Sequence, residues 1–127
     1  MNRVVITGMG AITPLGNTVT EFWDGIKNGK NGIAAITNFD ASETGISVAG
    51  EVKDFDATKY MDRKEYKRMD LFSQYAVAAS AQAVEQSGID MEKIDADRFG
   101  VTIGSGVGGF ITMESGIIKM HEKGPKR

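Results

Sequence analysis

The chain has 127 residues, which is the length of one domain or of part of a larger one. Its hydrophobic content of 41% and charged content of 25% are typical of a globular protein, and its net charge of −2 gives no overall attraction to nucleic acid or to a membrane. The absence of cysteine excludes disulfides, thiolate metal sites and a cysteine nucleophile within these residues. The N-terminal stretch MNRVVITGMG is too short in apolar residues for a signal peptide or a membrane span, so we expect a cytoplasmic protein.

The first part of the chain predicts a strand and then a helix. The stretch RVVITGMG has the β-branched composition of a buried strand at Arg3–Thr7, ended by two glycines. After the turn TPLGN, Thr18 and Glu21 have the spacing of a capping box, in which Glu21 reaches back to the start of the helix. We expect that helix to stop at Gly29.

The middle of the chain has weaker signals. Residues 29–46 show no sustained period and predict a long loop. The stretch SVAGEV alternates as a short strand does. The stretches DATKYM and DRKEYKRM predict two short helical pieces, the second with a capping box between Asp62 and Glu65.

The clearest predicted element is the helix in DLFSQYAVAASAQAVEQSG. Asp70 can cap its start and Gly88 can close its end. One face at helical spacing consists of Phe72, Ala76, Ala79 and Ala83.

The last part of the chain predicts a strand, a glycine-rich turn and a helix. The strand is expected at Phe99–Ile103, and the helix from about Phe110 to Lys123, where Gly124-Pro125 is a stop signal. Strands that alternate with helices in this way indicate an α/β protein with at least one sheet covered by helices.

The turn GSGVGG leaves two interpretations open. Gly104, Gly106 and Gly109 fit the pattern G-x-G-x-x-G, which cradles a dinucleotide pyrophosphate at the start of a helix. The acidic residue expected about 20 positions later falls at or beyond the last residue. A P-loop is excluded, because Phe110-Ile111 stands where Lys-Ser/Thr is needed. The other interpretation is a tight strand-to-helix crossing where backbones pack closely.

Several motifs in one register carry a family resemblance. They are VVITGMGAITPLGN, EFWDGIKNGKNGI, FDAS, VKDFDATKYMDRKEYKRMDLFSQYA, FGVTIGSGVGG and HEKGPKR. Over Met1–Arg127 the chain resembles the N-terminal part of the β-ketoacyl-[acyl-carrier-protein] synthase II family, the elongating condensing enzymes of bacterial fatty-acid synthesis. The resemblance implies a thiolase-like fold of five layers, α-β-α-β-α, of which residues 1–127 would be an incomplete N-terminal half without a second domain. It also implies a homodimer in the full enzyme, no cofactor, and acyl- and malonyl-loaded acyl carrier protein as partner.

The family's catalytic groups are absent from these residues. The resemblance implies a cysteine thiolate that carries the acyl group and two histidines that assist the decarboxylative condensation. The chain has no cysteine, and its single histidine, His121, matches neither catalytic position. We therefore assign no catalytic and no metal-binding residue here. Two alternatives stay open: a free-standing nucleotide-binding domain, and a catalytically dead remnant that only binds partners.

The resemblance assigns an acyl-pocket role to one group of residues. The family position that matches Val107 lies in the acyl pocket, and the neighbouring Gly106 and Gly108 would let the backbone pass close to an acyl chain. The alternative is that Val107 is an ordinary packing residue.

A basic cluster is the second candidate site. Lys64, Lys67 and Arg68 share a face at helical spacing, and Lys126 and Arg127 form a second basic pair. Because carrier protein is strongly acidic, a local positive patch would steer its approach and fix its orientation. The resemblance implies that all five residues belong to the carrier-protein docking face. The alternative is a solvated helix surface.

Overall fold

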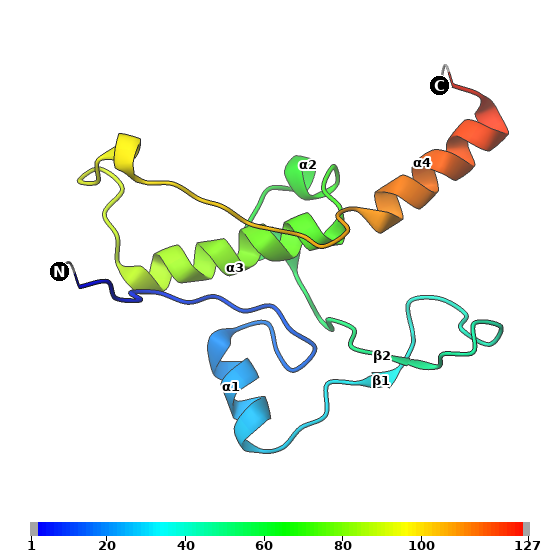
Figure 1. Ribbon diagram of the computed structural model, residues 1–127, viewed down its shortest axis with the longest axis horizontal. Coiled ribbons are helices and arrows are strands. Elements are labelled where there is room, and N and C mark those ends of the chain that lie inside the picture. Colours follow the sequence, from blue (N-terminus) through cyan, green and yellow to red (C-terminus); the bar gives the residue numbers. More distant parts are fainter. Residues whose placement is uncertain (1–2, 126–127) are drawn as a thin grey trace. The chain divides into compact units, whose positions relative to one another are not determined.

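The computed structural model describes residues 3–125 (Figure 1). The chain divides into two compact units. The first unit comprises the chain up to Asp56 together with Ala78–Ile89. The second comprises Ala57–Val77 together with the residues from Asp90 onward. Helix α3, Leu71–Ser87, contributes residues to both units, and each unit is described by itself.

Helix α1 of the first unit, Val19–Lys27, begins at the predicted cap. The Thr18 hydroxyl accepts a hydrogen bond from the Glu21 amide at 3.2 Å. The Glu21 carboxylate reaches back one residue further than a capping box requires, and accepts from the Asn17 amide at 2.7 Å. The start of the helix is therefore closed by side chains, as its sequence indicated.

Two short strands form a hairpin in the first unit. Strand β1, Ala34–Ala35, pairs antiparallel with strand β2, Val48–Ala49. The stretch SVAGEV predicted β2, but the partner β1 lies within residues 29–46, which were expected to be loop. That expectation was wrong because two alanines carry no strand signal, and their pairing depends on a segment more than ten residues away.

The predicted strand at Arg3–Thr7 does not form. These residues have no strand partner among residues 3–125, and Val4 and Ile6 are 90% and 83% exposed. The predicted strand at Phe99–Ile103 does not form either. A β-branched run becomes a strand only when another strand supplies its hydrogen-bond partners, and the described residues contain none for either run.

The N-terminal segment instead lies against helix α3 within the first unit. A Cβ atom added at Gly8 would collide with the Ala83 carbonyl, and one added at Gly10 would collide with the Ala79 carbonyl. Two glutamine side chains of the helix tie the segment down, because Gln86 Oε1 accepts from the Met9 amide at 2.6 Å and Gln82 Oε1 accepts from the Ala11 amide at 3.1 Å. The glycines that follow the apolar run therefore serve close backbone approach.

The second unit contains the short helices and the C-terminal helix. They are the 3₁₀ helix η1, Ala57–Lys59, helix α2, Arg63–Tyr66, the 3₁₀ helix η2, Ala96–Arg98, and helix α4, Phe110–Lys123. Both halves of the predicted capping box of α2 are present, and Gly124 ends α4 with a φ of 78°. These predictions are confirmed, since each depends on residues within a few positions of the helix end.

Few side chains of the second unit are buried. Ala57 and Met61, at either end of the turn that leads into α2, are each 8% exposed, and so is Gln74 of helix α3.

In the described part of the chain, no helix combines the length and the apolar character that a membrane span needs. Within the same residues, no cluster of three or more His, Asp or Glu side chains is arranged as metal ligands would be.

Candidate functional site

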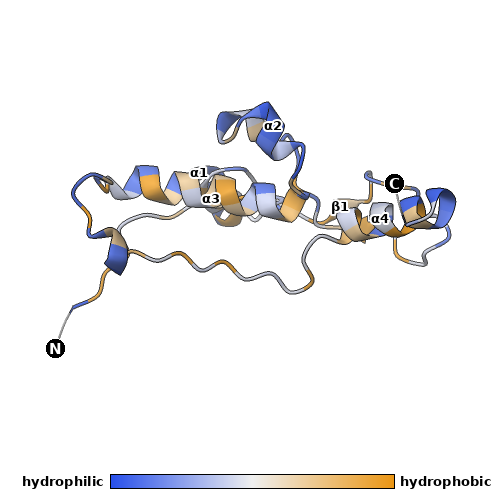
Figure 2. Ribbon diagram, turned by 90° about the horizontal axis from the view of Figure 1, so that it is seen from above, coloured by the Kyte–Doolittle hydropathy of each residue, from blue (hydrophilic) through white to orange (hydrophobic). Residues whose placement is uncertain are grey.

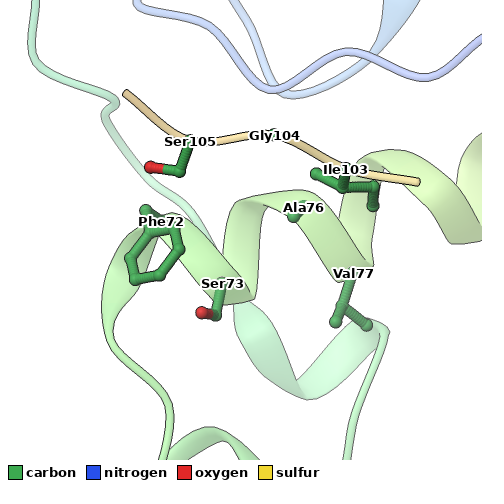
Figure 3. Close-up of a pocket in the computed structure, with 7 residues that line it drawn as sticks. All are labelled: Phe72, Ser73, Ala76, Val77, Ile103, Gly104 and Ser105. Atoms are coloured by element: carbon green, nitrogen blue, oxygen red, sulfur yellow. The ribbon is translucent and has the colours of Figure 1, made fainter. Parts of the chain in front are cut away.

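The second unit contains an open pocket of about 360 Å³. Figure 3 shows its lining, which consists of Phe72, Ser73, Ala76 and Val77 from helix α3 and Ile103, Gly104 and Ser105 from the segment alongside it. Aliphatic and aromatic groups dominate this lining, so the pocket favours an apolar occupant. The sequence placed Phe72 and Ala76 on one helix face, but it predicted no pocket at this position.

The glycine-rich turn continues directly from the pocket. The Ser105 hydroxyl accepts a hydrogen bond from the Gly108 amide at 3.0 Å, and Gly108 has a φ of 81°, which a side chain would strain. Val107 is 66% exposed and Gly106 is also exposed. The residues predicted for an acyl pocket, Gly106, Val107 and Gly108, thus follow the pocket lining in the chain without forming part of it.

A carboxylate lies at the start of helix α4. Asp70 Oδ2 accepts hydrogen bonds from the amide and the hydroxyl of Thr112, at 2.9 and 2.8 Å. These bonds hold the pKa of Asp70 below its ordinary value of 3.8, and the amides of Leu71 and Phe72 contribute less. Asp70 was predicted to cap α3, but its strongest interactions are with α4, at a residue 42 positions away. Gly109 accommodates the carboxylate, because a Cβ atom there would lie 3.0 Å from Asp70 Oδ2.

This carboxylate bears on the nucleotide interpretation of the glycine turn. A phosphate held by G-x-G-x-x-G lies against the amides at the N-terminus of the following helix. Here one of those amides, that of Thr112, already donates to the Asp70 carboxylate. A phosphate would meet a like charge at this position, so the turn is unsuited to binding a dinucleotide.

The basic cluster, defined as Lys64, Lys67 and Arg68, lies on and just after helix α2. All three side chains are exposed, and none forms an ion pair with an acidic group in residues 3–125. Figure 2 shows α2 as a strongly hydrophilic element. The other two residues predicted for docking, Lys126 and Arg127, lie outside the described residues.

The buried side chain of Gln74 binds the backbone next to the basic cluster. Gln74 Nε2 donates to the backbone carbonyls of Tyr66 and Met69, at 3.0 and 2.9 Å. Sequence reasoning missed this residue, because glutamine in a helix is usually exposed and both acceptors are backbone atoms that carry no sequence signal. His121 is exposed in the last turn of α4.

Solved structures of ketosynthases share this fold. A β-ketoacyl synthase from Burkholderia phymatum STM815 is 32% identical with a TM-score of 0.77, over 98% of this chain and 31% of that chain. A ketosynthase in complex with a type II polyketide synthase acyl-carrier protein is 29% identical with a TM-score of 0.74, over 94% of this chain and 30% of that chain. The fold is therefore the N-terminal part of the thiolase-like fold, and the fold class α/β is confirmed.

The sequence comparison defines the family. Residues 1–127 match the family model described as the β-ketoacyl synthase N-terminal domain, and the chain belongs to this family. The 3-oxoacyl-[acyl-carrier-protein] synthase 2 of Synechocystis sp. is 50% identical over 125 residues, which are 98% of this chain and 30% of that protein. The chain thus spans about a third of the length of the curated relatives that it matches.

Proposed function

We propose that this chain is the N-terminal segment of a 3-oxoacyl-[acyl-carrier-protein] synthase. Such an enzyme joins an acyl group to malonyl-acyl carrier protein and releases CO2. Since residues 1–127 include no cysteine, a thiolate that accepts the acyl group has to come from other residues of the enzyme. We further propose that the full enzyme is a cytoplasmic homodimer that uses no cofactor, and that this chain is an incomplete N-terminal half of the β-ketoacyl synthase domain in each subunit.

The basic cluster carries the proposal that this segment docks acyl carrier protein. Three exposed cations without acidic partners in the described residues lie within five positions of a chain whose net charge is −2. Unpaired surface cations keep their full potential for an acidic partner and accelerate its approach. A structural relative at 29% identity was solved with its acyl-carrier protein bound, which supports the same class of partner here. Lys126 and Arg127 are proposed to extend the docking face.

The glycine-rich turn is proposed to border the acyl chain. The turn follows the pocket-lining residues directly in the chain, and Val107 places an exposed aliphatic side chain at its centre. An exposed valine between glycines is available to form one wall of an apolar tunnel when further protein covers it. Gly106 and Gly108 keep this wall thin, since neither has a side chain.

The docking proposal is tested by charge reversal. The test uses the full-length synthase, defined as an enzyme in which this chain forms the N-terminal segment, and measures its Kd for fluorescently labelled acyl carrier protein. Lys67→Glu/Arg68→Glu is expected to weaken binding about tenfold at low salt, because two attractive charges become repulsive. The control Lys30→Glu/Lys53→Glu makes the same change in net charge at two exposed positions of the first unit, which contributes no residue to the proposed docking face. Equal weakening by both pairs, or by neither, would overturn the proposal.

A further inference from the structure

The buried amide of Gln74 holds both sides of the segment that carries Lys67 and Arg68. Its two acceptors, the carbonyls of Tyr66 and Met69, are the residues immediately before and after that pair. Gln74 is 8% exposed and is the buried polar side chain of the described residues. Because a primary amide has two N–H groups, one side chain satisfies both carbonyls at once.

The segment needs this external support, because its own structure is short. Helix α2 has four residues, Arg63–Tyr66, and the chain continues through a turn in which the Arg68 amide donates to the Glu65 carbonyl at 3.0 Å and the Met69 amide to the Tyr66 carbonyl at 3.2 Å. A helix of one turn is not stable without tertiary contacts. The backbone that orients Lys67 and Arg68 therefore depends on the attachment to helix α3 that Gln74 provides.

We propose that Gln74 is a positioning residue for carrier-protein docking, which acts by holding the backbone of Lys67 and Arg68 in the orientation that the acidic partner meets. This inference rests on the proposed docking function of the basic cluster. Gln74 itself is uncharged and buried, so it affects the partner only through the two cations. Preorganised charges lose less side-chain and backbone freedom on binding than charges on a loose turn, and they bind more tightly for that reason.

The substitution Gln74→Met separates positioning from charge. Methionine is close to glutamine in size and also uncharged, but it donates no hydrogen bond, so the net charge of the protein is unchanged. We expect the Kd of the full-length synthase for labelled acyl carrier protein to rise about fivefold, because Lys67 and Arg68 lose the hydrogen bonds that hold their backbone. We also expect a weaker dependence of that Kd on salt, although no charge has been removed. The KM for an acyl-CoA donor, which has no carrier protein to dock, should stay the same.

A matched control is available on the same helix. Gln86→Met removes a glutamine that accepts from the Met9 amide in the first unit. It should leave the affinity for carrier protein and its salt dependence unchanged. If Gln74→Met abolishes folding, as shown by loss of activity with acyl-CoA, Gln74→Asn carries the test, because it keeps the amide but is too short to reach both carbonyls.

A double-mutant cycle gives the decisive outcome. In the Gln74→Met background, Lys67→Glu/Arg68→Glu should weaken binding by a smaller factor than in the unaltered protein, because the cations there are already misplaced. Independent, multiplying effects of the two changes would overturn the positioning role while leaving the docking function intact. If charge reversal has no effect in either background, the docking function fails and the inference fails with it.

Discussion

Asp70 Oδ2 accepts hydrogen bonds from both the amide and the hydroxyl of Thr112, at 2.9 and 2.8 Å. A residue that directly precedes helix α3 thus provides the side-chain cap of helix α4, whose own N-cap residue, Gly109, has no side chain to offer. Asp70 can replace the N-cap side chain of α4, because Gly109 leaves room for the carboxylate and the carboxylate accepts from an amide that has no acceptor within the helix. Through this pair, the segment that follows the basic cluster is connected to the helix that follows the glycine-rich turn.

Protonation of Asp70 at low pH should weaken its hydrogen bonds with Thr112. The pKa of Asp70 is lowered by its hydrogen bonds to Thr112, so the folded protein binds fewer protons at this group than the unfolded chain does. The stabilisation is complete above the ordinary carboxyl pKa of 3.8 and is lost as the pH falls through the lowered value. An NMR titration of the Thr112 amide should therefore show a midpoint below 3.8. Exchange of that amide should become roughly fivefold faster in Asp70→Ala at neutral pH.

The matched control for Asp70 is Asp40, whose pKa is lowered by bonds to Ser42 in the first unit. Asp40→Ala should leave exchange of the Thr112 amide unchanged. A Thr112 amide that exchanges at the same rate in Asp70→Ala as in the unaltered protein would contradict the capping role.

Gly8 and Gly10 should not tolerate a side chain, whereas Gly116 in helix α4 should. A Cβ atom at Gly10 would collide with the backbone carbonyl of Ala79, so Gly10→Ala is expected to destabilise the first unit by about 3 kcal/mol. A Cβ atom at Gly116 meets no atom within 4 Å, so Gly116→Ala should stabilise α4 by up to about 1 kcal/mol. Urea unfolding of the chain followed by circular dichroism measures both changes. Similar effects of the two substitutions would exclude the close approach at Gly10.

Val107 should influence the length of acyl chain that the full-length synthase accepts. Val107→Phe adds volume to the proposed tunnel wall, so kcat/KM should fall about tenfold for long acyl chains and much less for short ones. Since Val107 is 66% exposed in this chain, the substitution should not reduce the stability of the second unit. Val101→Phe, at a position that is 71% exposed, serves as the control and should not change chain-length preference. A loss that is equal at every chain length would refute the assignment.

Local signals in the sequence predicted the helices well. The capping box at Asp62 and Glu65 and the bounds of the helix Phe110–Lys123 are confirmed, because caps and stop signals act within one helical turn. Residues whose partners are distant in the sequence were not predicted. The apolar runs at Arg3–Thr7 and Phe99–Ile103 have strand composition, but pairing is a property of two segments, and the described residues hold no second segment for either run.

The sequence indicated Lys64, Lys67 and Arg68 as a candidate docking site, because charged residues at helical spacing can be recognised without the structure. The structure shows that all three are exposed, and their role in docking remains a prediction. The supporting contacts of Gln74 and the capping bond of Asp70 were missed, because each depends on backbone positions that are fixed by tertiary structure. The resemblance supplied the roles of Val107 and its neighbours, which remain predictions.

The most direct test of the central claim, that this segment provides the docking surface for acyl carrier protein, compares two donors of the same acyl group. In the full-length synthase, Lys67→Glu/Arg68→Glu should lower kcat/KM about tenfold for the acyl-carrier-protein donor at low salt. For the acyl-CoA donor it should leave kcat/KM within about twofold of the unaltered enzyme, because no carrier protein approaches the basic cluster. Equal losses with both donors would show that Lys67 and Arg68 serve the structure of the enzyme rather than the docking of its partner.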